Sequence, residues 1–443
     1  MNIQLSDHFT ISKLLRFTLP SMAMMVLTSI YSVVDGLFVS NFVGDAALAA
    51  VNIVTPLPLA IGAFGVMLST GGSGEVSRAL GLGDGQRAKE YFSTLILTAL
   101  VLGLVLSGLG VVFIRPLCSL LGADEALLEL CAAYGTITVS GGAAFILQTV
   151  FQSFCIVAGR PKLGFSLSLA AGVTNMVLDG LFIAVLGWGV KGAALATLFG
   201  YLVGSVIPLG YFLRDNGTPL RLVPPRRDRE MLTRACYNGS SEFMSNFSLS
   251  LVTALYNRCL MGLIGEPGVA AYTVMMYVQY VSSAILIGFS MGSAPLFTLQ
   301  YGAGNVREFK NLFRKGLVTV CALSAGLTLL SQLLATPMAH IFVGYNEALL
   351  AMTVTGFRRF ALSFLLCGVS IFASALFTAL GDGTASAVIS FLRTLVFQCG
   401  AILLLPALMG LNGVWWAAVL AEGLALAVSA AMLYLRRKHY KYI

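Results

Sequence analysis

The sequence predicts an all-α polytopic membrane protein with twelve transmembrane helices arranged as two pseudo-symmetric six-helix lobes. Three observations support this fold class: the composition, the number of long apolar segments and an internal repeat. Of the 443 residues, 58% are hydrophobic and only 10% are charged, and the mean hydropathy is +0.88. Soluble domains carry about 25% charged residues, so this chain has too few charges to cover a surface that faces water.

Twelve apolar segments are long enough to cross a bilayer, which takes roughly 20 residues of helix. A buried helix of a soluble core would account for one or two such segments but not for twelve. Several segments exceed the minimum length, which predicts tilted or kinked helices. The expected spans are 15–40, 48–76, 90–114, 128–157, 164–187, 190–213, 234–262, 268–299, 312–336, 348–379, 385–408 and 413–436.

The longest polar stretch lies halfway along the chain and predicts a boundary between two lobes. Pro224 and Pro225 within it prevent a continuous helix. We therefore expect an N-terminal lobe over 1–213, a cytosolic linker over 214–233 and a C-terminal lobe with a basic tail over 234–443.

The basic residues predict the orientation, because loops rich in Lys and Arg stay on the cytosolic side. With the N-terminus inside, 21 of the 27 Lys and Arg residues lie at cytosolic ends, and only Arg115 and Lys191 lie in outer loops. We therefore expect a multi-pass protein of the plasma or inner membrane with both termini in the cytosol. The same asymmetry accounts for the net charge of +8 without a nucleic-acid partner.

An internal repeat relates the two halves, because glycines in the loops of the first half recur at a nearly constant interval in the second. Each half holds an even number of spans, so the two copies share one orientation. This predicts a pseudo-twofold axis along the membrane normal, and such parallel repeats are typical of secondary transporters with a central site. The pairs with one identical interval are Gly44 with Gly265, Gly81 with Gly302 and Gly192 with Gly413, and the interval from Gly159 to Gly381 is longer by a single position.

Acidic residues inside the predicted spans mark a candidate ion site, because a charged side chain there costs roughly 2.5–3.5 kcal/mol on insertion scales. Asp35, Asp179 and Thr197 fall near one depth of spans 1, 5 and 6, and Asn175 lies one turn before Asp179 on the same face. This all-oxygen set suits Na⁺, or a proton shared by the two acids. The alternative is a static hydrogen-bond network that braces the lobe.

Other charges within or near spans have structural interpretations. Glu422 and Arg393 come from neighbouring spans and are expected to neutralise each other, either as a structural pair or as part of a substrate contact. Glu75 lies three residues before Arg78 and is expected to pair with it at the helix end.

Aromatic residues and methionines supply candidate substrate contacts. Aromatic faces attract cations and flexible thioethers adapt to varied shapes, so a cavity lined by them and by acids suits bulky, apolar, cationic compounds. Packing between helices or against lipid is the alternative role for each. The candidates are Tyr31, Phe145, Phe154, Glu242, Met261, Tyr272, Met276, Tyr280 and Met291.

The segment 20–57 resembles the first two helices of the multidrug and toxic compound extrusion (MATE) family. It carries that family's helix-1 proline at Pro20, its membrane-embedded aspartate at Asp35 and its G-x-x-A-L-A-A signature at 44–50. The segments 77–84, 151–162 and 292–305 agree as well, as does the N-x-x-x-D pattern that ends at Asp179, so the resemblance covers nearly the whole chain.

The resemblance implies a monomeric antiporter that exports lipophilic, mostly cationic drugs or toxic compounds in exchange for H⁺ or Na⁺, with no other cofactor. It implies an ion site at Asp35, Asn175, Asp179 and Thr197. Some members add a second site that pairs a helix-7 glutamate with a helix-10 aspartate; Glu242 matches the first, but span 10 contains no carboxylate. Because Pro20 removes one backbone hydrogen bond, we also expect it to act as a hinge in span 1.

Three other classes of protein fit less well. A major facilitator transporter also has twelve spans in two halves, but the loop motif of that class is absent from 81–92. A lipid-linked oligosaccharide flippase of the same superfamily often has extra helices and a more basic cavity, whereas the deep charges here are mainly acidic. An intramembrane enzyme would need paired catalytic residues, and the three histidines lie near the ends of the chain or of spans, so we expect no enzyme.

Overall fold

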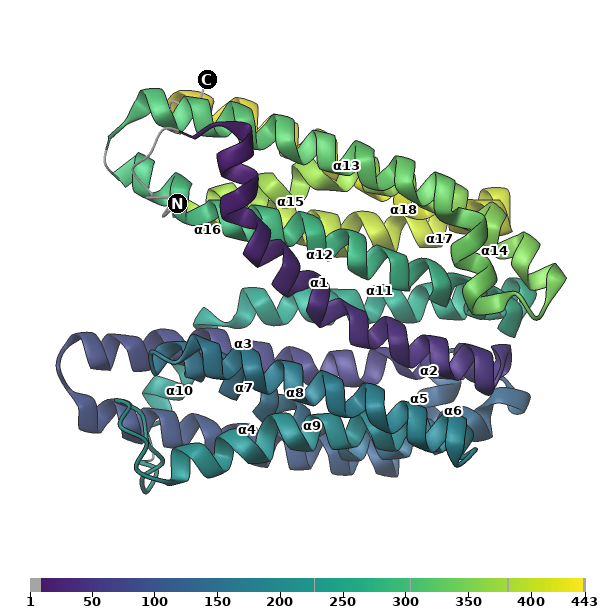
Figure 1. Ribbon diagram of the computed structural model, residues 1–443, viewed down its shortest axis with the longest axis horizontal. Helices are drawn as coiled ribbons and strands as arrows, with labels where there is room; N and C mark the ends of the chain where they lie inside the picture. The colour runs from purple at the N-terminus through teal and green to yellow at the C-terminus, as the bar shows by residue number, and fades with distance from the viewer. Residues whose placement is uncertain (1–8, 227, 303, 381, 441–443) are drawn as a thin grey trace. The chain divides into compact units, whose positions relative to one another are not determined.

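The computed structural model describes residues 9–440 apart from 227, 303 and 381, and the elements formed by these residues are all helical (Figure 1). The first half forms α1 (Ile11–Phe42), α2 (Asp45–Val54), α3 (Pro56–Gly81), α4 (Gly85–Val112), α5 (Ile114–Leu120), α6 (Glu125–Ser140), α7 (Gly142–Val157), α8 (Pro161–Asp179), the π-helix η1 (Gly180–Val185) and α9 (Gly189–Leu213). The second half forms α10 (Arg229–Asn238), α11 (Ser240–Ile264), α12 (Glu266–Gly302), α13 (Val306–Val343), α14 (Glu347–Phe360), α15 (Ser363–Ala379), α16 (Gly383–Phe391), the π-helix η2 (Leu392–Phe397), α17 (Gln398–Met409) and α18 (Leu411–Tyr440).

The helices confirm an all-α polytopic membrane protein. Nine helical stretches of the described chain are each long and apolar enough to cross a bilayer. Two further spans are broken pairs, α6–α7 with a bend of 46° and α14–α15 with a bend of 43°. The first predicted span falls in α1, whose apolar stretch Val33–Phe42 is shorter. The order of these elements matches the twelve spans that the sequence predicts.

The positions of the helices repeat along the chain as the glycines do. Helix α2 begins at Asp45 and α12 at Glu266, and α4 begins at Gly85 and α13 at Val306. Both intervals equal the one that separates the paired loop glycines. The fourth span of each half is the broken pair, and the fifth span of each half contains a π-helix. The repeat therefore extends from the loop sequences to the irregularities of the helices.

Packing divides the chain into two compact units, one formed by Val34–Gly262 and the other by Met1–Val33 together with Leu263–Ile443. We refer to them as the 34–262 unit and the 263–443 unit. They differ from the predicted lobes in two segments, because the first part of α1 packs with the C-terminal half and α10–α11 pack with the N-terminal half. The lobe boundaries predicted at 213 and 234 stay a prediction.

Close helix contacts explain why these two segments pack as they do. In α12, a Cβ added at Gly288 would lie 2.6 Å from Met22 Cα of α1, so the glycine permits the contact. Helix α11 is hydrogen-bonded to α2, where the Asn52 side chain donates to Asn257 Oδ1 (3.1 Å) and the Asn257 side chain donates to the Asn52 carbonyl (2.8 Å).

Helix α10 begins at Arg229, within the predicted linker, and Gly239 separates it from α11. The predicted pair of Glu75 with Arg78 stays a prediction, because the side chain of Arg78 lies outside the described residues. Glu75 is also paired with Arg234 of α10 at 3.2 Å. Helix α10 packs across α3 and brings this guanidinium to Glu75, which is only 7% exposed.

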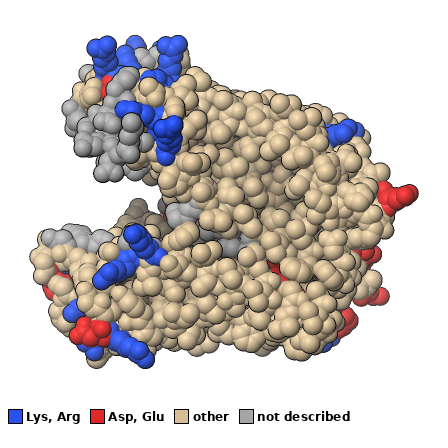
Figure 2. Space-filling view, viewed as in Figure 1, with Lys and Arg blue, Asp and Glu red and all other residues tan. Residues whose placement is uncertain are grey.

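Charge is distributed unevenly over the surface. On the face drawn in Figure 2, Lys and Arg gather toward one end of each unit, and most of the remaining surface of each unit carries few charges. A largely uncharged surface is expected of helices whose middle sections face lipid.

Candidate functional site

The structure brings the four predicted ion-site residues together within the 34–262 unit. Asp35 comes from the second part of α1, Asn175 and Asp179 from the last turn of α8, and Thr197 from α9. The carboxyl groups of Asp35 and Asp179 lie close enough to each other to interact. Asn175 Nδ2 donates to Thr197 Oγ1 at 3.4 Å.

Carboxylate oxygens of Asp35 and Asp179 are buried where no described residue donates a hydrogen bond to them. Asp179 is fully buried and Asn175 is 8% exposed. Both carboxylate oxygens of Asp179 and Oδ1 of Asp35 are buried with no hydrogen-bond donor among the described residues. Two facing carboxylates cannot both stay ionised and unpaired in such an environment, because burying an uncompensated charge costs several kcal/mol or more. The arrangement therefore requires a proton on one carboxyl or a cation between them.

Local helix geometry positions this cluster. The π-helix η1 starts at Gly180, directly after Asp179, and single π turns inside α-helices often accompany functional sites. Gly200 of α9 lets α8 approach closely, since a Cβ there would lie 3.2 Å from the Ala171 carbonyl oxygen and 3.4 Å from Asn175 Cβ. Neither feature was predicted, because no local sequence signal separates these glycines from the other glycines of the spans.

Pro20 lies within α1, which continues unbroken from Ile11 to Phe42. The boundary between the two compact units falls between Val33 and Val34 of the same helix, two residues before Asp35. The hinge at Pro20 stays a prediction.

The predicted substrate contacts fall into different environments. Phe154 is fully buried, and its ring centroid lies 4.9 Å from that of Phe92 in the interior of the 34–262 unit. Tyr272 and Met276 of α12 are each 4% exposed. The ring of Phe145 is half-buried and stacks on Tyr201 with a centroid distance of 4.6 Å.

The remaining candidates are more accessible. Met261 and Tyr280 are half-buried, and Met291 is 56% exposed. Glu242 is exposed in the first turn of α11. The side chain of Tyr31 lies outside the described residues. Their contact with a substrate stays a prediction.

The buried charges of the second half are paired, as predicted. Arg393 of η2 donates from Nε to both carboxylate oxygens of Glu422 in α18, at 2.8 Å and 3.1 Å. Both side chains are largely buried, with exposed fractions of 19% for Arg393 and 5% for Glu422.

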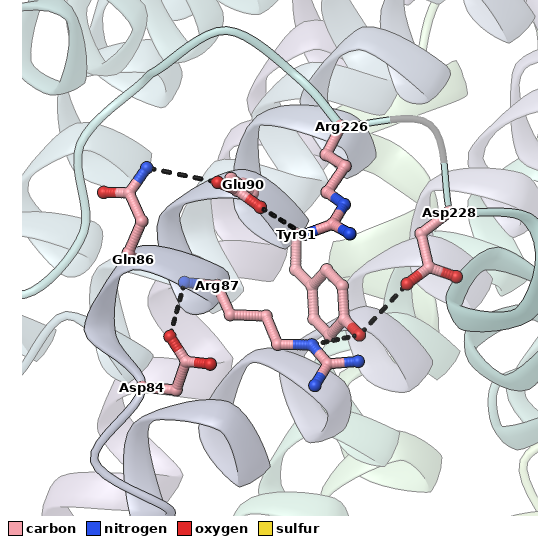
Figure 3. A pocket seen from close by; sticks show the side chains of 7 residues that line it. All are labelled: Asp84, Gln86, Arg87, Glu90, Tyr91, Arg226 and Asp228. Atoms are coloured by element: carbon pink, nitrogen blue, oxygen red, sulfur yellow. Dashed lines mark hydrogen bonds and ion pairs between the residues drawn. The ribbon is translucent and has the colours of Figure 1, made fainter.

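Sequence reasoning missed a polar pocket of about 270 Å³ where α4 begins and the linker ends (Figure 3). Tyr91 Oη accepts a hydrogen bond from Arg87 Nε (2.8 Å) and donates to the Asp228 carboxylate (3.2 Å). A hydrogen bond from the Met231 backbone N–H, followed by the one from Tyr91, holds the pKa of Asp228 below its usual value. The lining residues are Asp84, Gln86, Arg87, Glu90, Tyr91, Arg226 and Asp228.

The fold and the buried carboxylate pair together define a membrane protein of the duplicated, transporter-like class. Comparison with known families then gives the particular assignment: the profile of the MatE family matches residues 20–181 and 243–400. The protein therefore belongs to the MATE family, as the sequence motifs predict.

Individual relatives agree with the family assignment. The chain is 24% identical over 429 residues to the multidrug export protein MepA of Staphylococcus saprophyticus, covering 96% of this chain and 93% of that one. It is 23% identical over 431 residues to MepA of Staphylococcus aureus, with the same coverage.

Solved structures show the same fold. A MATE family transporter of the MOP superfamily in an inward-facing conformation superposes with a TM-score of 0.88 at 23% identity, covering 96% of this chain and 99% of that one. An outward-facing conformation of such a transporter gives a TM-score of 0.75 at 24% identity, covering 98% of each chain.

Proposed function

We propose that the protein is a secondary active antiporter of the cell membrane that exports lipophilic, mostly cationic drugs or toxic compounds in exchange for H⁺ or Na⁺. The observation that carries the proposal is the buried pair of Asp35 and Asp179, whose three donor-free oxygens need a proton or a cation. The relatives named as multidrug export proteins support the substrate class.

The chain's own groups suit either coupling ion. Na⁺ would be bound by the carboxylates of Asp35 and Asp179, with the side-chain oxygens of Asn175 and Thr197 completing an oxygen set of the kind that hard cations prefer. A proton would instead be retained between the two carboxyl groups. In both cases the ion removes most of the repulsion between them, and its release restores that repulsion.

Coupling follows if the two ion states favour different conformations. Within α1, Val33 is the last residue assigned to one compact unit, and Asp35 follows it by two residues. Repulsion between Asp35 and Asp179 acts directly on this part of α1 and favours a conformation in which the carboxylates reach water. Loading the site relieves the repulsion and favours the closed arrangement. Substrate release is linked to the ion through this shared equilibrium, with no enzymatic step.

Transport in proteoliposomes tests this function. Purified protein is reconstituted, ethidium movement is followed by fluorescence, and a proton gradient and a sodium gradient are imposed in separate experiments. We expect one of them to drive ethidium against its concentration gradient. Ethidium movement that neither gradient accelerates would contradict the antiport proposal.

The orientation forms part of the proposal, with the linker and both termini in the cytosol and the protein acting as a monomer. A Thr218→Cys variant places a thiol in the linker. We expect an impermeant maleimide to leave this thiol unlabelled in intact cells and to label it after permeabilisation. Labelling of residue 218 in intact cells would reverse the orientation.

A further inference from the structure

The ion pair of the 263–443 unit lies deep in the membrane-spanning region. Arg393 is ten residues beyond the start of α16 at Gly383, which is about 15 Å along a helix and half of a hydrocarbon core of about 30 Å. Burial of such a pair seldom adds stability, because the desolvation of both charges offsets their attraction. In a membrane, ionisable residues at this depth mark functional pathways by default.

A chain of hydroxyl groups begins one helical turn from this pair. Ser390 lies three residues before Arg393, and its Oγ is 2.9 Å from Ser374 Oγ of α15. Ser374 Oγ is in turn 2.9 Å from Ser386 Oγ. Thr378 Oγ1 completes the chain and donates to Ser386 Oγ at 2.8 Å.

The chain leads to the end of the helices where Tyr440 lies. Thr378 is exposed, and Ser386 is four residues from Asp382, whose carboxylate accepts a hydrogen bond from the Tyr440 hydroxyl at 3.1 Å and lies 3.5 Å from Arg436 Nε. The hydroxyl chain therefore connects the charged surface at this end with the level of the Arg393–Glu422 pair.

Two further hydroxyl groups of this unit, on α15 and α18, are buried without partners among the described residues. Ser370 lies on α15, four residues before Ser374, and Ser429 lies on α18, seven residues after Glu422. Both side chains are fully buried, and neither Oγ has a hydrogen-bond partner among the described residues. Buried polar groups are nearly always hydrogen-bonded to protein or to ordered water, so these hydroxyls indicate sites for ordered water on α15 and α18.

We infer that Glu422 exchanges a coupling proton with the end of the protein where Tyr440 lies, through the hydroxyl chain Ser390–Ser374–Ser386–Thr378. This inference rests on the proposed antiport function and adds a proton route in the second half to the ion site at Asp35 and Asp179. In this route, water would bridge the helical turn between Ser390 and the pair, about 5 Å along the axis, as ordered waters bridge polar groups in other proteins.

The step involves only O–H bonds. When Glu422 is protonated, one carboxylate oxygen gains the proton, Arg393 keeps its charge, and the neutral pair becomes singly positive. On release, the proton passes to the bridging water. Each hydroxyl oxygen along the chain then accepts a proton from the preceding group and donates the proton that it already carried to the next group. Among the described residues, Cys367 of α15 is a further titratable group that lies near both Arg393 and Glu422.

The test removes the central hydroxyl of the chain. Ser374 takes part in two of the three links and is half-buried, so we expect Ser374→Ala to fold. Ser374→Thr keeps a hydroxyl at the same place. Ser290→Ala is the matched control, because Ser290 is a buried serine of the same unit that donates to the Leu286 carbonyl within its own helix. Each full-length variant is reconstituted with a pH-sensitive dye inside the vesicles, and ethidium-dependent proton flux is measured.

We expect Ser374→Ala to slow the proton flux several-fold with unchanged ethidium binding, and Ser374→Thr and Ser290→Ala to keep the wild-type rate. Unchanged flux in Ser374→Ala, or equal slowing in Ser290→Ala, would overturn the inference. Wild-type transport driven by Na⁺ alone would also overturn it while leaving the antiport function intact. Absence of any gradient-driven ethidium transport would instead refute the proposed function.

A second variant tests Glu422 without leaving a buried charge unpaired. The double variant Arg393→Gln with Glu422→Gln replaces the ion pair by two neutral amides. We expect ethidium binding to persist and ethidium-dependent proton flux to fall as it does in Ser374→Ala. Wild-type flux in the double variant would show that the pair is only structural.

Discussion

Two glycines of α3, three residues apart, are predicted to respond in opposite ways to the same substitution. At Gly71, an added Cβ would lie 1.8 Å from the carbonyl oxygen of Ala235 in α10, whereas at Gly74 it would meet no atom within 4 Å. Real Cβ atoms essentially never come closer than 3.0 Å to such an atom. Since the atom belongs to the backbone, no side-chain rotation relieves the clash, and α10 itself has to move away from α3.

The expected free energies follow from two terms. Replacing Gly by Ala within a helix gains about 1 kcal/mol in both variants. Overpacking typically costs about 1–3 kcal/mol, and a backbone clash of this size belongs at the upper end or beyond. Gly71→Ala should therefore lose about 2 kcal/mol of unfolding free energy, while Gly74→Ala gains up to about 1 kcal/mol.

Thermal unfolding in detergent measures both variants, and the alkylation rate of Cys236 reports locally on α10. We expect Gly71→Ala to lower Tm and to accelerate labelling of Cys236, which is half-buried next to Ala235. Gly74→Ala should do neither. Equal Tm values and equal labelling rates in the two variants would refute the close packing of α3 against α10.

Three further outcomes follow from the described contacts. Tyr91→Phe removes the hydroxyl that joins Arg87 to Asp228 and should cost about 2 kcal/mol, seen as a lower Tm and faster proteolysis of the linker. Because the pKa of Asp228 is lowered in the folded protein, its stabilising contribution is present above about pH 4 and is lost as the pH falls below that value. Asp228→Asn should therefore flatten the acid limb of a Tm-against-pH curve, and an unchanged acid limb would contradict this. Phe154→Ala should cost about 3–5 kcal/mol, because its ring is fully buried; an unchanged Tm would contradict a core role.

The membrane fold was predictable because its determinants are regular along the chain. Composition and span length alone require bilayer helices, and the interval between the paired loop glycines reappears between the first residues of α2 and α12. The grouping of Asp35, Asp179 and Thr197 was predictable for a similar reason. A helix rises about 1.5 Å per residue, so counting from the ends of a span gives the depth of a side chain.

Contacts between distant segments were not predictable in the same way. Glu75 pairs with Arg234, 159 residues along the chain, and nothing in the sequence around Glu75 indicates this partner. Sequence proximity identifies neighbours within a helix but not the helix that packs across it. Phe154 illustrates a second limit: within an apolar span, a side chain facing lipid, a cavity or the protein interior has the same sequence context, and only packing distinguishes these environments.

The measurement that tests the central claim most directly is gradient-driven ethidium efflux by Asp35→Asn and Asp179→Asn in proteoliposomes, with Glu242→Gln as the matched control. Each aspartate variant removes one of the two facing carboxylates and keeps the size of the side chain. Asp35→Asn and Asp179→Asn should fold and lose coupled efflux. Glu242, which is exposed in the first turn of α11, should tolerate its substitution with a smaller loss. Wild-type coupled efflux in both aspartate variants, together with its loss in Glu242→Gln, would contradict an ion site at Asp35 and Asp179.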